Sequence, residues 1–504
     1  MIAGKKRQGE GNHAMPSHHI AVDIGAGSGR AFVGWLEDGK INTREIHRFA
    51  TSDMLLHDKR VLNGLRFYEE VVRALSAYAR DYGPELRSIG ADSFSSDFTI
   101  LDSWGRPIYP IRSYRDDTLV SIEPLIEERY GSYRLYQRNG NHSMPNDTLQ
   151  QMIRLVREGD PALREPHGIL FVADLMNFLL GGRLANEHSM ASYSRLFNRN
   201  DEAWDSEVMD AFGIPSGITT EVVYAGDVLG TVRDSIAREV KAGAGAEVIC
   251  ACSHDTSSAA LSIPDLGDDW AFISSGSWSL VGTETAAPVY LEKAWKHNFS
   301  NSTMPLRTNM FKKNVTGMWL MQQCKKAWGK YSDEEMVRLA EERPDIDLYI
   351  DVDRRELYAP ADMPAAIAAL VERTCGKAVD SSDCGLLVRI CLQSIAMKYR
   401  YYLELLGELS GKALKKIYII GGGSKIRILN EMTASVTGMP VYTGIYEGSV
   451  TGNLLLQMYG SGELGSKEEM RQVVINTFPV NEFLPGDQGG WEKKYARYRE
   501  LMGF

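Results

Sequence analysis

Several features that define whole classes of proteins are scarce in this chain of 504 residues. Its six cysteines are too few for a disulfide scaffold at this length. All of its apolar runs stop short of the roughly 18 residues that a membrane-spanning helix needs. Residues 1–17 include Lys5, Lys6 and Arg7 but lack the apolar segment of a secretory signal. We therefore expect a cytoplasmic protein whose residues 1–17 form a flexible tail.

Positive charge is also in short supply. The 66 acidic residues outnumber the 56 lysines and arginines, which gives a formal net charge of −10. A nucleic-acid-binding surface needs a basic face, so this composition argues against that class of partner. A small anionic ligand is still compatible, because glycine turns and helix N-termini bind phosphate through backbone N–H groups. We expect small-molecule ligands, and neither a nucleic acid nor a membrane as partner.

Two common nucleotide-binding motifs are missing as well. The chain has no G-x-x-x-x-G-K-S/T sequence, which excludes a P-loop enzyme. Residues 25–29 (GAGSG) have the spacing G-x-G-x-G and lead into a strand rather than a helix, which excludes a dinucleotide-binding Rossmann motif. Cys252 and His254 could form half of a metal site, but no second pair has ligand spacing. We therefore expect no structural metal.

The order of the predicted elements indicates an α/β protein with two similar halves. In the first half, residues 19–35 read as two strands joined by a glycine turn, and helical and strand patterns then alternate. After a polar connection over residues 262–269, a second strand and glycine turn repeat this plan. A long helical pattern later leads to a strand over residues 416–420. We predict a domain over residues 18–262 and a second over 263–504 that ends in a helix.

Two turns rich in glycine and hydroxyl groups, residues 26–30 (AGSGR) and 275–277 (SGS), are suited to holding phosphate. Asp23 lies in an apolar strand beside the first turn, where it could hold Mg²⁺ through water or cap the amides of the turn. Residues 421–423 are three glycines, which permit a flat ligand such as adenosine to approach the backbone. An ordinary strand-to-helix turn would have the same sequence.

The most informative residue is Asp255. It follows the apolar run 247–251, which we predict to be a strand, and lies within the small polar segment 253–258 (SHDTSS). Small neighbours leave room for a substrate hydroxyl, and a carboxylate there can accept its proton during phosphoryl transfer. The alternative is that Asp255 caps a helix. Two phosphate turns around this aspartate favour phosphoryl transfer.

From residue 20 to residue 458 the chain resembles the FGGY family of carbohydrate kinases. The most specific blocks are residues 253–259 (SHDTSSA) and 274–280 (SSGSWSL). They are supported by the residues of 314–322 that read N-x-x-G-x-W-L-x-Q, and by 420–423 and 447–453. The resemblance implies two actin-like (ribonuclease-H-like) ATPase domains with a catalytic cleft between them. It also implies ATP and Mg²⁺ as cofactors, with sugar and catalytic aspartate on the N-terminal domain and nucleotide on the C-terminal domain.

By the same resemblance, Asp255 is the general base that activates a sugar hydroxyl. The residues implied to bind the sugar are Ser95, Asp97, His254, Thr256 and Asn314. Those implied to bind ATP are Ala26, Gly27, Ser28, Gly29, Arg30, Ser277, Gln322 and Gly422.

The implied substrate is a ketose phosphorylated on its primary hydroxyl, with L-rhamnulose the first choice. Alternatives are L-fuculose, D-xylulose or L-xylulose. Family members acting on L-rhamnulose typically have the sequence DTWGVDF where residues 92–98 here read DSFSSDF, so we expect one wall of the sugar pocket to differ.

Two readings from other functional classes remain open. One is an actin-like ATPase that acts as a switch, and the other is a sugar-binding regulator without turnover. A base at Asp255 separates the kinase from the switch, and the presence of every catalytic candidate in the sequence argues against the regulator. We expect a monomer or a homodimer.

Overall fold

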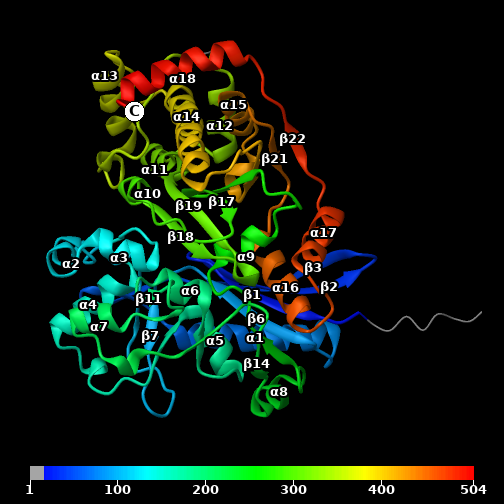
Figure 1. The fold of residues 1–504 in the computed structure, drawn as a ribbon. Helices are drawn as coiled ribbons and strands as arrows, with labels where there is room; N and C mark the ends of the chain where they lie inside the picture. Colours follow the sequence, from blue (N-terminus) through cyan, green and yellow to red (C-terminus); the bar gives the residue numbers. More distant parts are fainter. Residues whose placement is uncertain (1–15, 345) are drawn as a thin grey trace, which may run out of the picture.

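The computed structural model describes residues 16–344 and 346–504. Most of the predicted tail, residues 1–15, therefore lies outside the described residues. The described chain forms two α/β domains, with the N-terminal domain below and the C-terminal domain above in Figure 1. Each domain is built around one mixed β-sheet.

The sheet of the N-terminal domain has the strand order β14-β15-β6-β1-β2-β3. Strands β1, β2 and β3 are antiparallel neighbours. Asp38 and Gly39 form the hairpin turn between β2 and β3, with φ of 52° and 71°. β6 then adds in parallel beside β1, and β15 adds in parallel beside β6. The strands are β1 (His19–Ile24), β2 (Ser28–Glu37), β3 (Lys40–Ala50), β6 (Ser88–Ser93), β14 (Val228–Thr231) and β15 (Glu247–Ile249).

The sheet of the C-terminal domain has the order β18-β19-β17-β16-β20-β21-β22. Its central five strands repeat the first plan, because β16, β17 and β19 are antiparallel neighbours and β20 and β21 then add in parallel. This confirms the predicted α/β class and the repetition seen in the sequence. The strands are β16 (Trp270–Ser275), β17 (Trp278–Thr285), β18 (Phe299–Thr303), β19 (Asn309–Thr316), β20 (Lys416–Ile420), β21 (Val441–Thr443) and β22 (Asn481–Phe483).

Two helices join the domains, α9 (Asp255–Leu261) and α16 (Gly448–Gly460), and they lie between the two sheets in Figure 1. On one side, Leu454 of α16 packs in a cluster with residues of the N-terminal sheet such as Ala21. On the other side, Ala260 of α9 packs with Phe272 of the C-terminal sheet. The segment that carries Asp255 at the start of α9 therefore lies where the two domains meet.

Other helices cover the outer faces of the sheets. In the N-terminal domain, α1 (Gly64–Tyr82), α5 (Val172–Leu180) and α8 (Asp234–Val240) pack on the first sheet. In the C-terminal domain, α11 (Trp319–Trp328), α14 (Cys384–Ser410), α15 (Arg427–Thr437) and α18 (Gln488–Met502) contribute to the core of the second. Predicted helical patterns fall inside α1, α4 (Thr148–Glu158) and α14. α17 (Lys467–Thr477) is late in sequence but packs against β3 of the first sheet.

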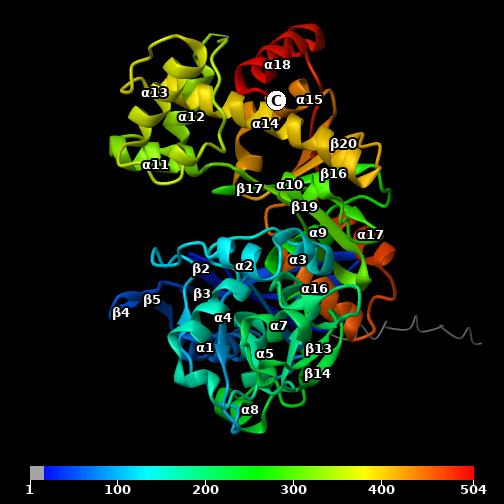
Figure 2. The ribbon, with the colours of Figure 1, turned by 60° about the vertical axis from the view of Figure 1, so that its left-hand side comes forward.

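A smaller helical layer of the N-terminal domain approaches the second sheet. Here α3 (Ser132–Asn139) contacts α10 (Glu292–Lys296), and α6 (His188–Tyr193) contacts β18. Figure 2 shows α3 at the top of the N-terminal domain, on the side of the C-terminal domain. The remaining elements are β4 (Met54–Leu56), β5 (Lys59–Leu62), β7 (Phe98–Ile100), β8 (Ile111–Arg112), β9 (Ile169–Phe171), β10 (Ala185–Glu187), β11 (Phe197–Asn198), β12 (Ala203–Trp204), β13 (Glu221–Val223), α2 (Glu123–Arg129), α7 (Ser206–Phe212), α12 (Asp333–Glu341) and α13 (Met363–Cys375). Among the residues described, no helix is both long and apolar enough to cross a membrane.

Candidate active site

Asp255 is the first residue of α9, and the N-cap position falls on His254. The strand predicted over residues 247–251 ends at Ile249, and the chain pairs with β6 again farther on, where Ser93 N–H donates to the Ser253 carbonyl over 2.8 Å. Asp255 Oδ1 accepts hydrogen bonds from the Thr256 backbone N–H (2.5 Å) and hydroxyl (3.0 Å). The side chain of Asp255 keeps 31% of its surface exposed. Water or a sugar hydroxyl can therefore reach this carboxylate.

The surroundings of Asp255 make it a stronger base than an exposed aspartate. Burial raises the pKa of Asp255 to about 6, and the charge of Asp23 acts in the same direction. Hydrogen bonds from Thr256 and the charge of Lys312 act against this rise. A base with a pKa just below neutrality is ionised at pH 7 and still holds a proton well.

Two buried carboxylates hold the segment that carries Asp255. Glu187 Oε2 accepts hydrogen bonds from the backbone N–H groups of Ser253 and Ser189, both over 2.9 Å. Asp174 Oδ1 accepts one from the Ser253 hydroxyl over 2.6 Å. Burial raises the pKa of Glu187 to about 7 and that of Asp174 well above its usual range. Sequence reasoning missed both residues, because their role depends on contacts across the N-terminal domain.

Two of the predicted sugar-binding residues lie beside one aromatic ring, that of Tyr193, and a third adjoins Asp255. The imidazole of His254 stacks on Tyr193, with ring centroids 5.1 Å apart, and the Ser95 side chain is hydrogen bonded to Tyr193. Thr256 adjoins Asp255 on α9. Burial lowers the pKa of His254 well below its usual range, with the charge of Lys312 acting in the same direction, so this imidazole is neutral at pH 7.

Asp97 and Asn314 occupy different settings. Asp97 is 1% exposed and accepts hydrogen bonds from Tyr114 N–H (3.0 Å) and Gln151 Nε2 (3.4 Å), so the N-terminal domain itself occupies both carboxylate oxygens. Asn314 lies half-buried on β19, beside Leu280 of β17. The divergent segment identified in the sequence also packs here, because the ring of Phe94 lies 5.6 Å from that of Tyr114.

The first phosphate turn joins β1 to β2. A side chain at Gly29 would collide with Phe49, whereas one at Gly27 would meet no atom within 4 Å. The predicted ATP-binding residues Ala26, Gly27 and Ser28 thus include one glycine that is open to a ligand. The guanidinium of Arg30, another predicted ATP-binding residue, is already paired with two carboxylates, because it donates to Asp23 over 2.8 Å and to Glu447 over 2.6 Å.

The second phosphate turn joins β16 to β17. The Ser277 hydroxyl donates to Gln322 over 2.8 Å, so these two predicted ATP-binding residues lie together. Gly421 has φ of +81°, and Gly423 is pressed against the Ser275 side chain. Gly422 between them faces open space, with no atom within 4 Å of a built Cβ. Because β16 and β20 are parallel neighbours, Ser277 and Gly422 lie near the same edge of the sheet.

Asp23 and Asp92 face each other from β1 and β6 at the same register position. Asp23 also accepts a hydrogen bond from Ser449 (3.0 Å), and Asp92 accepts one from Asn453 (2.6 Å), so the start of α16 holds both. Burial and the charge of Asp23 raise the pKa of Asp92 well above its usual range. Within the described ranges, no three His, Cys, Asp or Glu side chains are grouped so that they could hold a metal ion.

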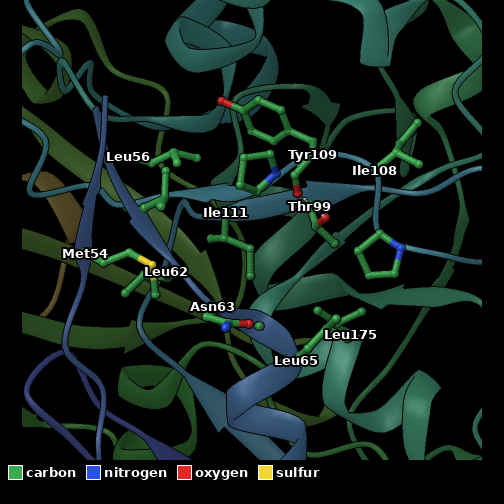
Figure 3. A pocket seen from close by; sticks show the side chains of 14 residues that line it. Met54, Leu56, Leu62, Asn63, Leu65, Thr99, Ile108, Tyr109, Ile111 and Leu175 are labelled. Atoms are coloured by element: carbon green, nitrogen blue, oxygen red, sulfur yellow. Dashed lines mark hydrogen bonds between the residues drawn. The ribbon is translucent and has the colours of Figure 1, made fainter. Parts of the chain in front are cut away.

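Figure 3 shows an apolar pocket of about 320 Å³ elsewhere in the N-terminal domain. It is lined by residues of the β4–β5 hairpin, β8 and α5, among them Met54, Leu62, Ile111 and Leu175. Its lining has no acidic or basic side chain and none of the predicted site residues. It offers no group for phosphoryl transfer.

The sequence of both domains matches one known protein family. Residues 18–262 match the N-terminal domain of the FGGY family of carbohydrate kinases, and residues 271–461 match the C-terminal domain of the same family. The chain belongs to this family. It is a carbohydrate kinase, as the sequence predicted.

Its relatives include rhamnulokinases. The chain is 31% identical over 488 residues to a rhamnulokinase from Bacteroides thetaiotaomicron, which covers 97% of this chain and 100% of that protein. A rhamnulokinase from Bacillus subtilis is 30% identical over 482 residues, covering 93% of this chain and 96% of that one. The resemblance to rhamnulokinases is thus confirmed over nearly the whole sequence.

Solved structures confirm the predicted actin-like fold with two domains. A gluconate kinase from Lactobacillus acidophilus superposes with a TM-score of 0.82 at 13% identity, covering 97% of this chain and 98% of that one. A glycerol kinase from Plasmodium falciparum with ADP superposes with a TM-score of 0.79 at 13% identity, again over 97% and 98%. At this level of identity the likeness establishes the fold.

Proposed function

We propose that this kinase transfers the γ-phosphoryl group of ATP to the primary hydroxyl of a ketose, with L-rhamnulose the first choice. The observation that carries the proposal is Asp255, a partly exposed carboxylate with a raised pKa at the start of α9. The rhamnulokinase relatives support the choice of sugar.

In the proposed reaction, Asp255 accepts the proton of the sugar hydroxyl as that oxygen attacks the γ-phosphorus. The three contacts of Asp255 within the described chain all use Oδ1, so Oδ2 is available to the hydroxyl. The backbone N–H groups of the turns at Gly27 and Ser277 would stabilise charge on the phosphates. Neutral His254 would orient the sugar, and closing of the domains would keep water from the phosphoryl group.

Mg²⁺ is part of this proposal, with Asp23 as its contact through water. The site residues fit such an ion, because the carboxylates of Asp23, Asp92 and Asp255 act on one another electrostatically, Arg30 offsets part of that charge at Asp23, and a cation near them would relieve the rest. Mg²⁺ usually keeps several waters and binds one or two carboxylates together with substrate phosphates. When bound, it would neutralise charge on the transferring phosphoryl group.

A coupled assay of ADP release over a panel of ketoses tests the function. We expect L-rhamnulose to give the highest kcat/KM, with measurable activity on L-fuculose or L-xylulose, since contact with a methyl group is worth only about 1–3 kcal/mol. The Phe94 and Ser95 departure favours a second candidate, a kinase for another ketose. A preference of more than about a hundredfold for another ketose would establish that candidate and reject L-rhamnulose.

The role of Asp255 has its own test. Asp255→Asn is expected to lower kcat by roughly 10²–10⁴-fold, the usual contribution of a positioned base, while sugar binding is retained. Asp268→Asn makes the same chemical change at a side chain that is 92% exposed and should leave turnover unchanged. Turnover of a folded Asp255→Asn variant within a few-fold of wild type would contradict the assignment.

The cytoplasmic location and the oligomeric state stay predictions.

A further inference from the structure

Lys312 is a buried lysine that the proposed mechanism does not use. Its residue is 2% exposed, and within the described chain it has neither an ion pair with a carboxylate nor a hydrogen bond from its ammonium group. Its contact is with an aromatic face, because Nζ lies 4.8 Å from the centroid of the Tyr193 ring. A buried cation without an ion pair is costly, and burial lowers the pKa of Lys312 to about 7.

The alternation of β19 places Lys312 on the face that lies between the domains. Phe311 and Val315 belong to the core on the α14 side of the sheet. Met310 belongs to the opposite cluster, which contains Ala260 of α9. Since alternate residues of a strand share a face, Lys312 and Asn314 follow Met310 on the side of α9.

The strands beside Lys312 place one residue without a side chain and one polar residue next to it. Its partner on β17 is Gly282, which has no side chain, and its partner on β18 is Ser300. The Ser300 hydroxyl is hydrogen bonded to His142 of the N-terminal domain. Lys312 therefore lies where residues of both domains meet the sugar-binding wall formed by Tyr193.

The titratable groups around Lys312 supply little compensating charge. Asp255 is the acidic group that acts on it, whereas Arg199 adds a positive charge. Burial lowers the pKa of His254 and of His142, and the charge of Lys312 acts in the same direction on both, so both imidazoles stay neutral. The groups that also face Asp255 are Asp23, Asp92, Tyr114 and Tyr193.

We propose that Lys312 is a substrate-binding residue whose Nζ donates a hydrogen bond to a sugar oxygen next to the reacting hydroxyl, and whose charge keeps Asp255 ionised. In a ketose, the carbon next to the primary hydroxyl carries the carbonyl oxygen, which is a suitable acceptor. A sugar with no oxygen on that carbon would leave the buried ammonium unpaired, so Lys312 selects for substrates that carry an oxygen next to the reacting hydroxyl. The inference rests on the proposed function and deepens it.

Two substitutions separate the two roles of Lys312. Lys312→Met keeps the volume and removes both donor and charge, and should lower kcat/KM for the preferred ketose by about 10- to 100-fold. Lys312→Gln keeps an N–H donor without the charge and should retain more of that activity. Both should move the acid limb of the pH profile of kcat/KM to higher pH, because the charge that lowers the Asp255 pKa is gone. Lys313→Met makes the same change on the opposite face of β19 and should leave the limb in place.

Binding of a non-hydrolysable ATP analogue is measured for the wild type and each variant, because retained binding shows that a variant is folded. Suppose that the wild type turns over a ketose, that kcat/KM of Lys312→Met is within twofold of wild type, and that the acid limb does not move. This result would overturn the present inference and leave the proposed function standing. A loss in Lys312→Met with no shift of the limb would overturn the claim that Lys312 keeps Asp255 ionised. Absence of wild-type turnover on every ketose would overturn the proposed function and this inference together.

Discussion

Glu187 is a buried carboxylate whose hydrogen-bond donors belong to the segment that carries Asp255. Burial raises the pKa of Glu187 from 4.5 to about 7, so the folded protein holds a proton there that the unfolded chain releases. Stability from this group is therefore present below about pH 4.5 and is lost as the pH rises through 7. At 1.36 kcal/mol for each pKa unit, the whole loss is about 3 kcal/mol.

The corresponding prediction concerns Glu187→Gln. The substitution removes the titration, so stability measured by urea unfolding should fall less between pH 5 and pH 8 in the variant than in wild type. Glu341→Gln on the exposed face of α12 is the matched control and should follow the wild-type pH dependence. Parallel pH dependences for wild type and Glu187→Gln would show that Glu187 titrates normally.

Residues at the site differ in how far the sequence could predict them. Asp255 was predictable, because a single carboxylate among small polar residues after an apolar run is a local pattern. Lys312 was not, since its meaning depends on which face of β19 it occupies and on Tyr193 of a distant helix. Alternation from Asn314, which was predicted, is the one sequence signal that could have indicated it.

At the scale of elements, the strands and long helices were predictable from their apolar periodicity. The contact between α9 and α16 was not, because it joins residues almost 200 positions apart. Gly452 shows why this contact is demanding: a Cβ there would lie 1.9 Å from the Ser258 carbonyl oxygen. The packing of α17 on β3 was hidden for the same reason, since the sequence alone assigns α17 to the C-terminal domain.

Gly452→Ala is predicted to destabilise the protein. Alanine in place of glycine inside a helix is normally favourable by about 1 kcal/mol. Here the clash is with backbone, which cannot rotate away, and overpacking typically costs about 1–3 kcal/mol. We expect a net loss in urea stability, with a larger loss of activity because α9 carries Asp255. Gly489→Ala in α18, where a Cβ meets no atom within 4 Å, should be neutral or stabilising; equal behaviour of the two variants would refute the argument.

The whole molecule is held together on two sides of Asp255. On one side lie α9 and α16, and on the other the helical layer of the N-terminal domain meets the C-terminal domain. There the Tyr136 hydroxyl donates to the Val289 carbonyl over 3.2 Å, and the hydroxyls of Ser192 and Thr303 are hydrogen bonded over 3.1 Å. These contacts join the domains on the side of Tyr193, so we expect domain closing and ligand binding to be coupled.

A variant that weakens this second contact tests the coupling. Tyr136→Phe combined with Ser192→Ala removes two hydrogen bonds at almost constant volume, which favours the open arrangement by about 1–3 kcal/mol. If closing is required for tight nucleotide binding, the apparent affinity falls with the closed fraction, and sugar restores that fraction. In calorimetric titrations, a non-hydrolysable ATP analogue with Mg²⁺ should bind the variant several-fold more weakly than wild type without sugar, and nearly as tightly with saturating L-rhamnulose.

Tyr442→Phe, which removes the hydroxyl bonded to Glu482 within the C-terminal domain, is the control and should bind as wild type does. The same loss of affinity with and without sugar would mean that these contacts stabilise the fold without gating the cleft.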